Sequence, residues 1–145
     1  MNEKGPIRAN ITQTVPYFSV GNMEQSIHFY VEQLGFKITN QWIPRGKIEW
    51  CWLQRGGGAL MLQTFNAGSV WEGKRGEGVA IFFQCEDAIA LYNEFIDNQV
   101  KAFEPFVGNG LWDLKVIDPD GYHLHFESVT DVPEETMYSE WAKNK

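Results

Sequence analysis

Apolar and polar positions along the chain recur with two different periods, and the changes of period predict strands and helices. The β-rich run TVPYFSV at 14–20 predicts a strand. Over 23–34 the apolar residues recur every three or four positions, which predicts a helix with Asn22 as its N-cap and Gly35 just beyond its end. Three more strands complete a β-α-β-β-β unit: 36–43, 47–55 and 58–65, with turns at 44–46 and 56–58.

The same order of elements occurs a second time. A strand at 78–85 and a helix at 86–98 precede three further strands, at 100–106, 110–118 and 122–128. A shift of 62 places Tyr30 on Tyr92, and a shift of 64 places Leu60 on Leu124. An internal repeat of this kind predicts two tandem modules, at 14–66 and 77–128.

The repeat predicts an α+β fold. Each module has one helix, which can cover only one face of its sheet. We therefore expect the two βαβββ modules to form a curled mixed sheet around a central cavity, where a ligand would bind. A short C-terminal helix at 133–144 follows, with Met137, Tyr138 and Trp141 along one side, and it would close the cavity or cover a partner subunit.

Composition excludes several classes of protein. The formal charge of −7 argues against nucleic acid as a partner, since phosphate binding needs a basic face. No stretch resembles a signal peptide or approaches the ~20 apolar residues of a membrane helix. Cys51 and Cys85 lie in apolar runs and form no CxxC motif, so we expect reduced, packed thiols and a cytoplasmic protein.

The stretch VIDPDGYHLHFES at 116–128 carries His123, His125 and Glu127 at alternate positions, which places them on one face of a strand. Two imidazoles and a carboxylate could bind a metal, but one strand cannot make them converge on an ion without ligands from other strands. The third histidine, His28, lies within the predicted first helix and supplies none. We interpret the sequence DPDG at 118–121 as a turn and not as part of a catalytic site.

VPYFSVGNMEQSIHFYVEQLGF at 15–36 and VIDPDGYHLHFE at 116–127 resemble the two signatures of the vicinal oxygen chelate superfamily, which includes glyoxalase I, extradiol dioxygenases and bleomycin-resistance proteins. The four metal-ligand positions of that superfamily fall on Val15, Met61, Ala80 and His125. Valine and alanine cannot bind a metal, and a methionine thioether is a poor ligand for the metals concerned. The resemblance therefore implies no metal and no cofactor here, and it implies a homodimer, often with halves exchanged.

Several residues are candidates for contact with a ligand. His125 takes the family's metal-ligand position and should face the cavity. There it could bind a small molecule or transfer a proton. Alternatively, it could simply hydrogen-bond to a neighbouring side chain or to water. Alternation through Met61 and His125 adds Gln63, His123 and Glu127. Trp50 and Trp52 share one face of their strand. They could pack under a helix, or they could line the cavity and stack on a ligand. The same two alternatives apply to Trp112.

The resemblance is closest to the bleomycin-resistance branch, whose first strand likewise has a VP-like pair in place of the ligand histidine. It implies a metal-independent protein that binds a flat or cationic small molecule in an acidic, aromatic-lined cavity. One alternative is an enzyme of the glyoxalase or dioxygenase type, which requires a divalent metal. Another is a metal-free lyase or isomerase with His125 as general base, assisted by Glu49 or Asp113. A dimer that binds no ligand is the third.

Overall fold

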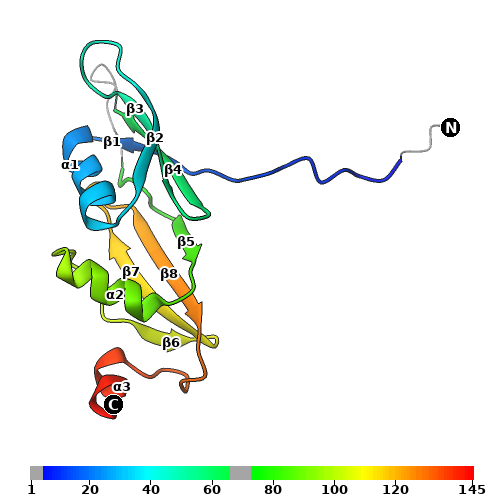
Figure 1. Ribbon diagram of the computed structural model, residues 1–145, viewed down its shortest axis with the longest axis vertical. Coiled ribbons are helices and arrows are strands. Elements are labelled where there is room, and N and C mark those ends of the chain that lie inside the picture. Colours follow the sequence, from blue (N-terminus) through cyan, green and yellow to red (C-terminus); the bar gives the residue numbers. More distant parts are fainter. Residues whose placement is uncertain (1–4, 66–72) are drawn as a thin grey trace.

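A computed structural model describes residues 5–65 and 73–145. It contains two modules of four strands each, which follow one another along the longest axis of the molecule (Figure 1). The first comprises β1 (Tyr17–Val20), α1 (Met23–Ile27), the π-helix η1 (His28–Gln33), β2 (Lys37–Trp42), β3 (Trp50–Arg55) and β4 (Gly58–Thr64). The second comprises β5 (Ala80–Gln84), α2 (Ala88–Asp97), β6 (Phe106–Gly108), β7 (Leu111–Ile117) and β8 (His123–Val129), followed by α3 (Tyr138–Lys143).

The two sheets have the same topology. Their strand orders are β1-β4-β3-β2 and β5-β8-β7-β6, with the first and last strands of each module parallel and the remaining pairs antiparallel. The predicted α+β fold of two tandem βαβββ units is confirmed. The repeat in the sequence thus reflects a repeat of the whole supersecondary unit.

The first helix begins and ends as its sequence predicts. The side chain of Asn22 accepts a hydrogen bond from the Gln25 amide, and Gly35 has a φ of +79° beyond the helix end. The second half of this helix is wound as a π-helix, in which the Leu34 amide donates to the Phe29 carbonyl at 2.9 Å.

Each helix covers one face of its own sheet, and alternate strand residues pack beneath it. Leu53, Leu60 and Leu62 are fully buried in the first module, as are Leu114 and Leu124 in the second. A single hydrophobic core contains residues from both modules. The side chains between these positions lie on the opposite face of each sheet, which no helix of the described residues covers.

The largest differences from the sequence prediction concern the strand at 100–106 and the C-terminal helix. Within 100–106 the structure has only an isolated bridge between Ala102 and Val116, and strand β6 begins at Phe106, because Pro105 has no amide hydrogen to donate. The C-terminal helix begins at Tyr138 instead of residue 133, because Glu135 has a φ of +64°, which a right-handed helix excludes.

The turn between β7 and β8 joins the modules. Buried Asp118 accepts hydrogen bonds from the Tyr30 hydroxyl at 2.7 Å and from the amides of Asp120 and Tyr122. Asp120 in turn accepts from the Gly21 amide and pairs with Arg75. The DPDG segment is a turn, as predicted, and its carboxylates also tie the first helix to the second module.

Within the described residues, no helix combines the length and the apolar character that a membrane crossing requires. Cys51 and Cys85 are free thiols, as expected.

Candidate ligand-binding surface

The uncovered face of the first sheet is largely aromatic. In the strand register Trp42 lies opposite Trp50, Trp52 lies opposite Met61, and Met61 lies beside Tyr17. Directly opposed side chains of this kind are about 5 Å apart at Cβ. We call this face the module 1 surface; it consists of Tyr17, Trp42, Trp50, Trp52, Met61 and Gln63. The two tryptophans predicted to share a face therefore lie away from the helix, together with predicted Met61 and Gln63.

Trp42 was not predicted from the sequence as part of this surface. Ile38 pairs with Leu53 and packs against the core, so simple alternation would also turn Trp42 toward the core. The register shifts by one residue between Ile38 and Asn40, and this bulge moves Trp42 to the uncovered face. Trp42 is 52% exposed there.

The uncovered face of the second sheet is polar and titratable. His123, His125 and Glu127 occupy alternate positions of β8, as predicted. Asp113 and Lys115 lie opposite Glu127 and His125 on β7, and Phe82 lies beside His125 on β5. These residues make up the module 2 surface: Phe82, Asp113, Lys115, His123, His125 and Glu127.

His125 is held between two neighbours. Its Nδ1 lies 2.8 Å from Asp113 Oδ1, and its ring stacks on Phe82 with the centroids 4.2 Å apart. When Asp113 accepts a hydrogen bond from the Nδ1–H of a neutral imidazole, the tautomer is fixed and Nε2 is left as a hydrogen-bond acceptor. Asp113, named from the sequence as one of two possible carboxylate partners, is the one in contact. Glu49 instead pairs with Arg45.

Trp112 lies on the other side of β7. Only 4% of it is exposed, and its ring packs against Trp141 and Tyr138 of α3, with centroids 5.5 and 6.5 Å away. The C-terminal helix is therefore docked on its own module through its predicted apolar side. Of the two readings of Trp112, the structure shows the packed one: Trp112 is buried, and it lies on the opposite face of β7 from its neighbour Asp113, which contacts His125.

The four family ligand positions do not provide a metal site. Val15, Met61 and Ala80 offer no nitrogen or oxygen side-chain donor, and His125 uses Nδ1 to contact Asp113. Among residues 5–65 and 73–145, no three His, Cys, Asp or Glu side chains are grouped as metal ligands. The donors present thus do not fit the metal of the metal-dependent relatives.

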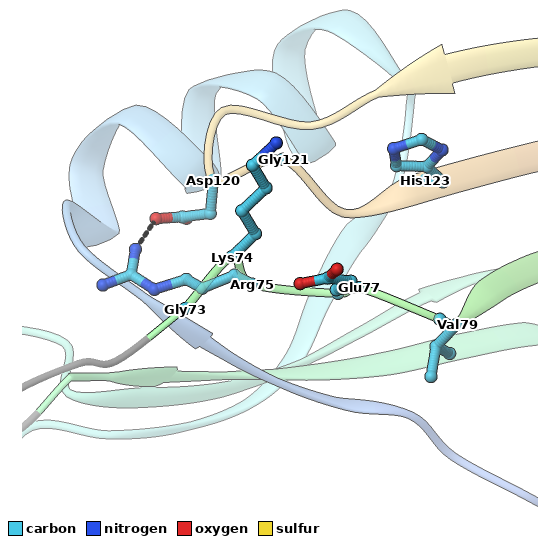
Figure 2. A pocket seen from close by; sticks show the side chains of 10 residues that line it. Gly73, Lys74, Arg75, Glu77, Val79, Asp120, Gly121 and His123 are labelled. Atoms are coloured by element: carbon cyan, nitrogen blue, oxygen red, sulfur yellow. Dashed lines mark hydrogen bonds and ion pairs between the residues drawn. The ribbon is translucent and has the colours of Figure 1, made fainter.

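Two cavities lie at the borders of these surfaces. One, of about 630 Å³, is lined by the segment 73–79 and by Asp120, Gly121 and His123; Figure 2 shows the Arg75–Asp120 contact at its edge. The other, of about 1010 Å³, lies between the β3–β4 turn, β5 and α2. Neither is lined by Trp50, Trp52 or His125. Neither of these two cavities is therefore the shared one that the sequence predicts. Trp71, which lies between the two predicted modules 14–66 and 77–128, is outside the described residues.

This geometry defines a class of protein: two tandem βαβββ modules, each with one helix-covered face and one open face. The model of the Glyoxalase/Bleomycin resistance protein/Dioxygenase superfamily matches residues 11–126, so the chain belongs to that superfamily. A comparison with curated proteins finds no match.

Several solved structures share the fold. TioX from Micromonospora sp. ML1 has a TM-score of 0.65 at 17% identity, with 81% of this chain and 98% of that chain covered. TnmS3 from Streptomyces sp. CB03234, described as an antibiotic binding protein, has a TM-score of 0.64 at 20% identity, with 85% and 100% covered. A glyoxalase/bleomycin resistance protein/dioxygenase from Nocardioides has a TM-score of 0.65 at 14% identity, with 88% and 89% covered.

Proposed function

We propose that this protein binds a flat, aromatic or cationic small molecule without a metal ion. The observation that carries the proposal is the group of three tryptophans, Trp42, Trp50 and Trp52, on a sheet face that no helix covers. Indole rings interact favourably with flat aromatic rings by stacking and with cations over the ring face. The antibiotic-binding description of TnmS3, a protein of the same fold, supports a binding role.

We further propose that the site is completed in a homodimer. Within one chain the modules follow one another end to end (Figure 1), and the module 1 and module 2 surfaces line no common cavity among those described above. Tyr17, Trp42 and Phe82 are each about half exposed, at 54%, 52% and 48%. Large exposed apolar side chains such as these, present on both surfaces, favour association with a partner. In the proposed dimer, the module 1 surface of one chain faces the module 2 surface of the other, so tryptophans lie on one side of the ligand and His125, Asp113 and Glu127 on the other.

A screen of planar aromatic compounds, cationic and neutral, tests the binding function. We expect at least one compound to quench tryptophan fluorescence and to raise the melting temperature, because a ligand that binds only the folded protein stabilises it by mass action. At 100 times the dissociation constant the stabilisation is about 2.7 kcal/mol. The bound compound should be recovered chemically unchanged. A broad screen without quenching or thermal shift would leave a dimer that binds no ligand as the better description.

The absence of a metal requirement is a separate prediction. Because His125 is the sole nitrogen or oxygen side-chain donor at the four family positions, we expect less than about a tenth of an equivalent of Zn, Ni, Mn or Fe per purified chain. Elemental analysis of the purified protein measures this directly. About one equivalent of metal, lost in the His125→Ala variant, would contradict the prediction and favour the metal-dependent enzymes of the superfamily.

One observation favours a second candidate, a metal-free lyase or isomerase. The Asp113–His125 contact of 2.8 Å is the arrangement in which a carboxylate orients an imidazole as a general base. In that case a compound from the same screen would be converted during incubation, and His125→Ala would abolish the conversion while it only weakened binding. Recovery of the unchanged compound favours the binding protein.

A further inference from the structure

The smaller of the two cavities lies between a glycine-rich loop and the start of β8. Residues 73–79 form the loop, and Asp120, Gly121 and His123 line the rest of the cavity. Its volume of about 630 Å³ is within the range of about 300–1,000 Å³ that is usual for small-molecule sites. We call it the loop pocket. It borders the module 2 surface, because His123 belongs to both.

Contacts with the rest of the protein hold the loop in place. Arg75 forms an ion pair with Asp120, and only 18% and 8% of these two side chains are exposed. The next residue, Gly76, has a φ of +74°, and a Cβ at this position would lie 2.8 Å from the Tyr122 ring. Tyr122 in turn stacks on Phe18 of β1. The backbone that carries the neighbouring lining residues is therefore fixed, as a preorganised site requires.

Two charges of opposite sign in the loop pocket have no partner in the described part of the chain. Arg75 and Asp120 neutralise each other. Lys74 and Glu77 also line the pocket, but they form no ion pair with each other or with another described residue. Figure 2 shows their side chains leaving the loop in different directions. A ligand held between them can therefore meet a positive and a negative group at once.

His123 and Val79 add two further kinds of contact. The His123 side chain makes no hydrogen bond to another described residue, so its ring nitrogens can bind a ligand. Val79 is 60% exposed and presents an apolar surface to the same pocket. The loop pocket thus combines both charges with a hydrogen-bonding group and an apolar wall.

We propose that the loop pocket binds a zwitterion, either an amino acid or a small molecule that carries an amino-acid group. The carboxylate of the ligand pairs with Lys74 and its ammonium group pairs with Glu77, while an apolar side chain lies beside Val79. A simple anion would also meet Glu77, and a simple amine would also meet Lys74, so a like charge would oppose each of them. Trp50 and Trp52 do not line this pocket, so the proposal goes beyond the proposed function and does not depend on it.

L-leucine and two of its analogues test the proposal in the full-length protein. Isoamylamine lacks the carboxylate of leucine and isocaproate lacks its ammonium group, whereas the branched hydrocarbon part is the same. In a titration followed by heteronuclear NMR of the amide groups, we expect L-leucine to shift the signals of Gly76, Gly78 and Gly121, which line the pocket. The expected dissociation constant is about 1 mM or lower. Each analogue should bind about threefold or more weakly, because it loses one charge pair.

Charge-neutralising variants assign each contact. Lys74→Gln should lower the affinity for L-leucine to about that for isoamylamine, without weakening the binding of isoamylamine itself. Glu77→Gln should have the corresponding effect with isocaproate. Lys143→Gln on α3 and Glu24→Gln on α1 remove exposed charges elsewhere and should leave the affinity for L-leucine unchanged. Trp52→Ala should also leave it unchanged, so failure of this proposal is distinguishable from failure of the tryptophan site.

Three results would overturn the proposal. If isoamylamine or isocaproate binds as tightly as L-leucine, the pocket recognises a single charge and not a zwitterion. If L-leucine shifts none of the three glycine signals, the loop pocket does not bind it. If Lys143→Gln weakens the binding of L-leucine as much as Lys74→Gln does, the effect comes from the overall charge of the protein and not from a contact in the pocket.

Discussion

Asp118→Ala should lower the free energy of unfolding by about 3 kcal/mol or more, because it leaves three buried hydrogen-bond donors without an acceptor at about 1–3 kcal/mol each. Asp118 accepts from the Tyr30 hydroxyl at 2.7 Å and from the amides of Asp120 and Tyr122 at 2.9 and 2.8 Å. Alanine leaves these three donors without an acceptor in a site where Asp118 is only 4% exposed. For a chain of this length the loss corresponds to a fall in melting temperature of about 10 °C or more.

Two control variants distinguish the loss of the Asp118 hydrogen bonds from the effect of removing any aspartate. Asp118→Asn keeps an oxygen for both amides and an amide that can donate to the Tyr30 oxygen, so we expect a loss of about 1–2 kcal/mol. Asp131→Ala removes an exposed aspartate and should change stability by less than about 0.5 kcal/mol. Urea denaturation of the three variants measures the series. A loss below about 1 kcal/mol in Asp118→Ala would show that the turn does not join the modules.

The pH dependence of this network has a definite sign. Burial raises the pKa of Asp118 above its usual value, against the opposing effect of the hydrogen bonds from Tyr30, Tyr122 and Asp120. The folded state therefore binds a proton more readily than the unfolded state at this site. The stability that comes from this group is fully present below its unfolded pKa and is lost as the pH rises through its folded pKa. Asp118→Asn removes this contribution.

The sequence predicts the fold well because the repeat, the helix caps and the glycine turns are local signals. Asn22 and Gly35 act where the pattern places them, and alternation correctly puts Trp50 with Trp52, and His123 with His125. Such alternation holds as long as the strand pairing has no irregularity.

The parts of the candidate site that the sequence does not predict depend on pairing between strands. The bulge beside Thr39 turns Trp42 to the open face, and the sequence around Thr39 contains no residue that predicts this register shift. The stacking of Phe82 on His125 depends on the register between β5 and β8. In the described part of the chain the two modules lie end to end (Figure 1), and the two cavities described above are not shared between the module 1 and module 2 surfaces. The order of elements does not determine how the modules are placed.

Replacing the surface tryptophans should abolish most ligand binding. Trp50→Ala and Trp52→Ala should each weaken binding of the most stabilising planar compound by about 30-fold or more, which is the effect of losing about 2 kcal/mol at an aromatic hot spot. Trp50 and Trp52 are only partly buried, so the melting temperature without ligand should fall by a few degrees at most. Fluorescence quenching and isothermal titration calorimetry measure the affinities.

Trp42→Ala and Trp112→Phe complete the series. If the bulge places Trp42 beside Trp50 as described, Trp42→Ala should weaken binding by about tenfold, a smaller effect because Trp42 is 52% exposed and lies on β2, at the edge of the sheet. Trp112→Phe removes a buried indole from the opposite side of the second sheet, so it should lower stability and leave the affinity unchanged. Equal affinities in the wild-type, Trp50→Ala and Trp52→Ala proteins would place the ligand elsewhere. A loss of affinity in Trp112→Phe as large as in Trp52→Ala would show that binding follows general stability instead of the module 1 surface.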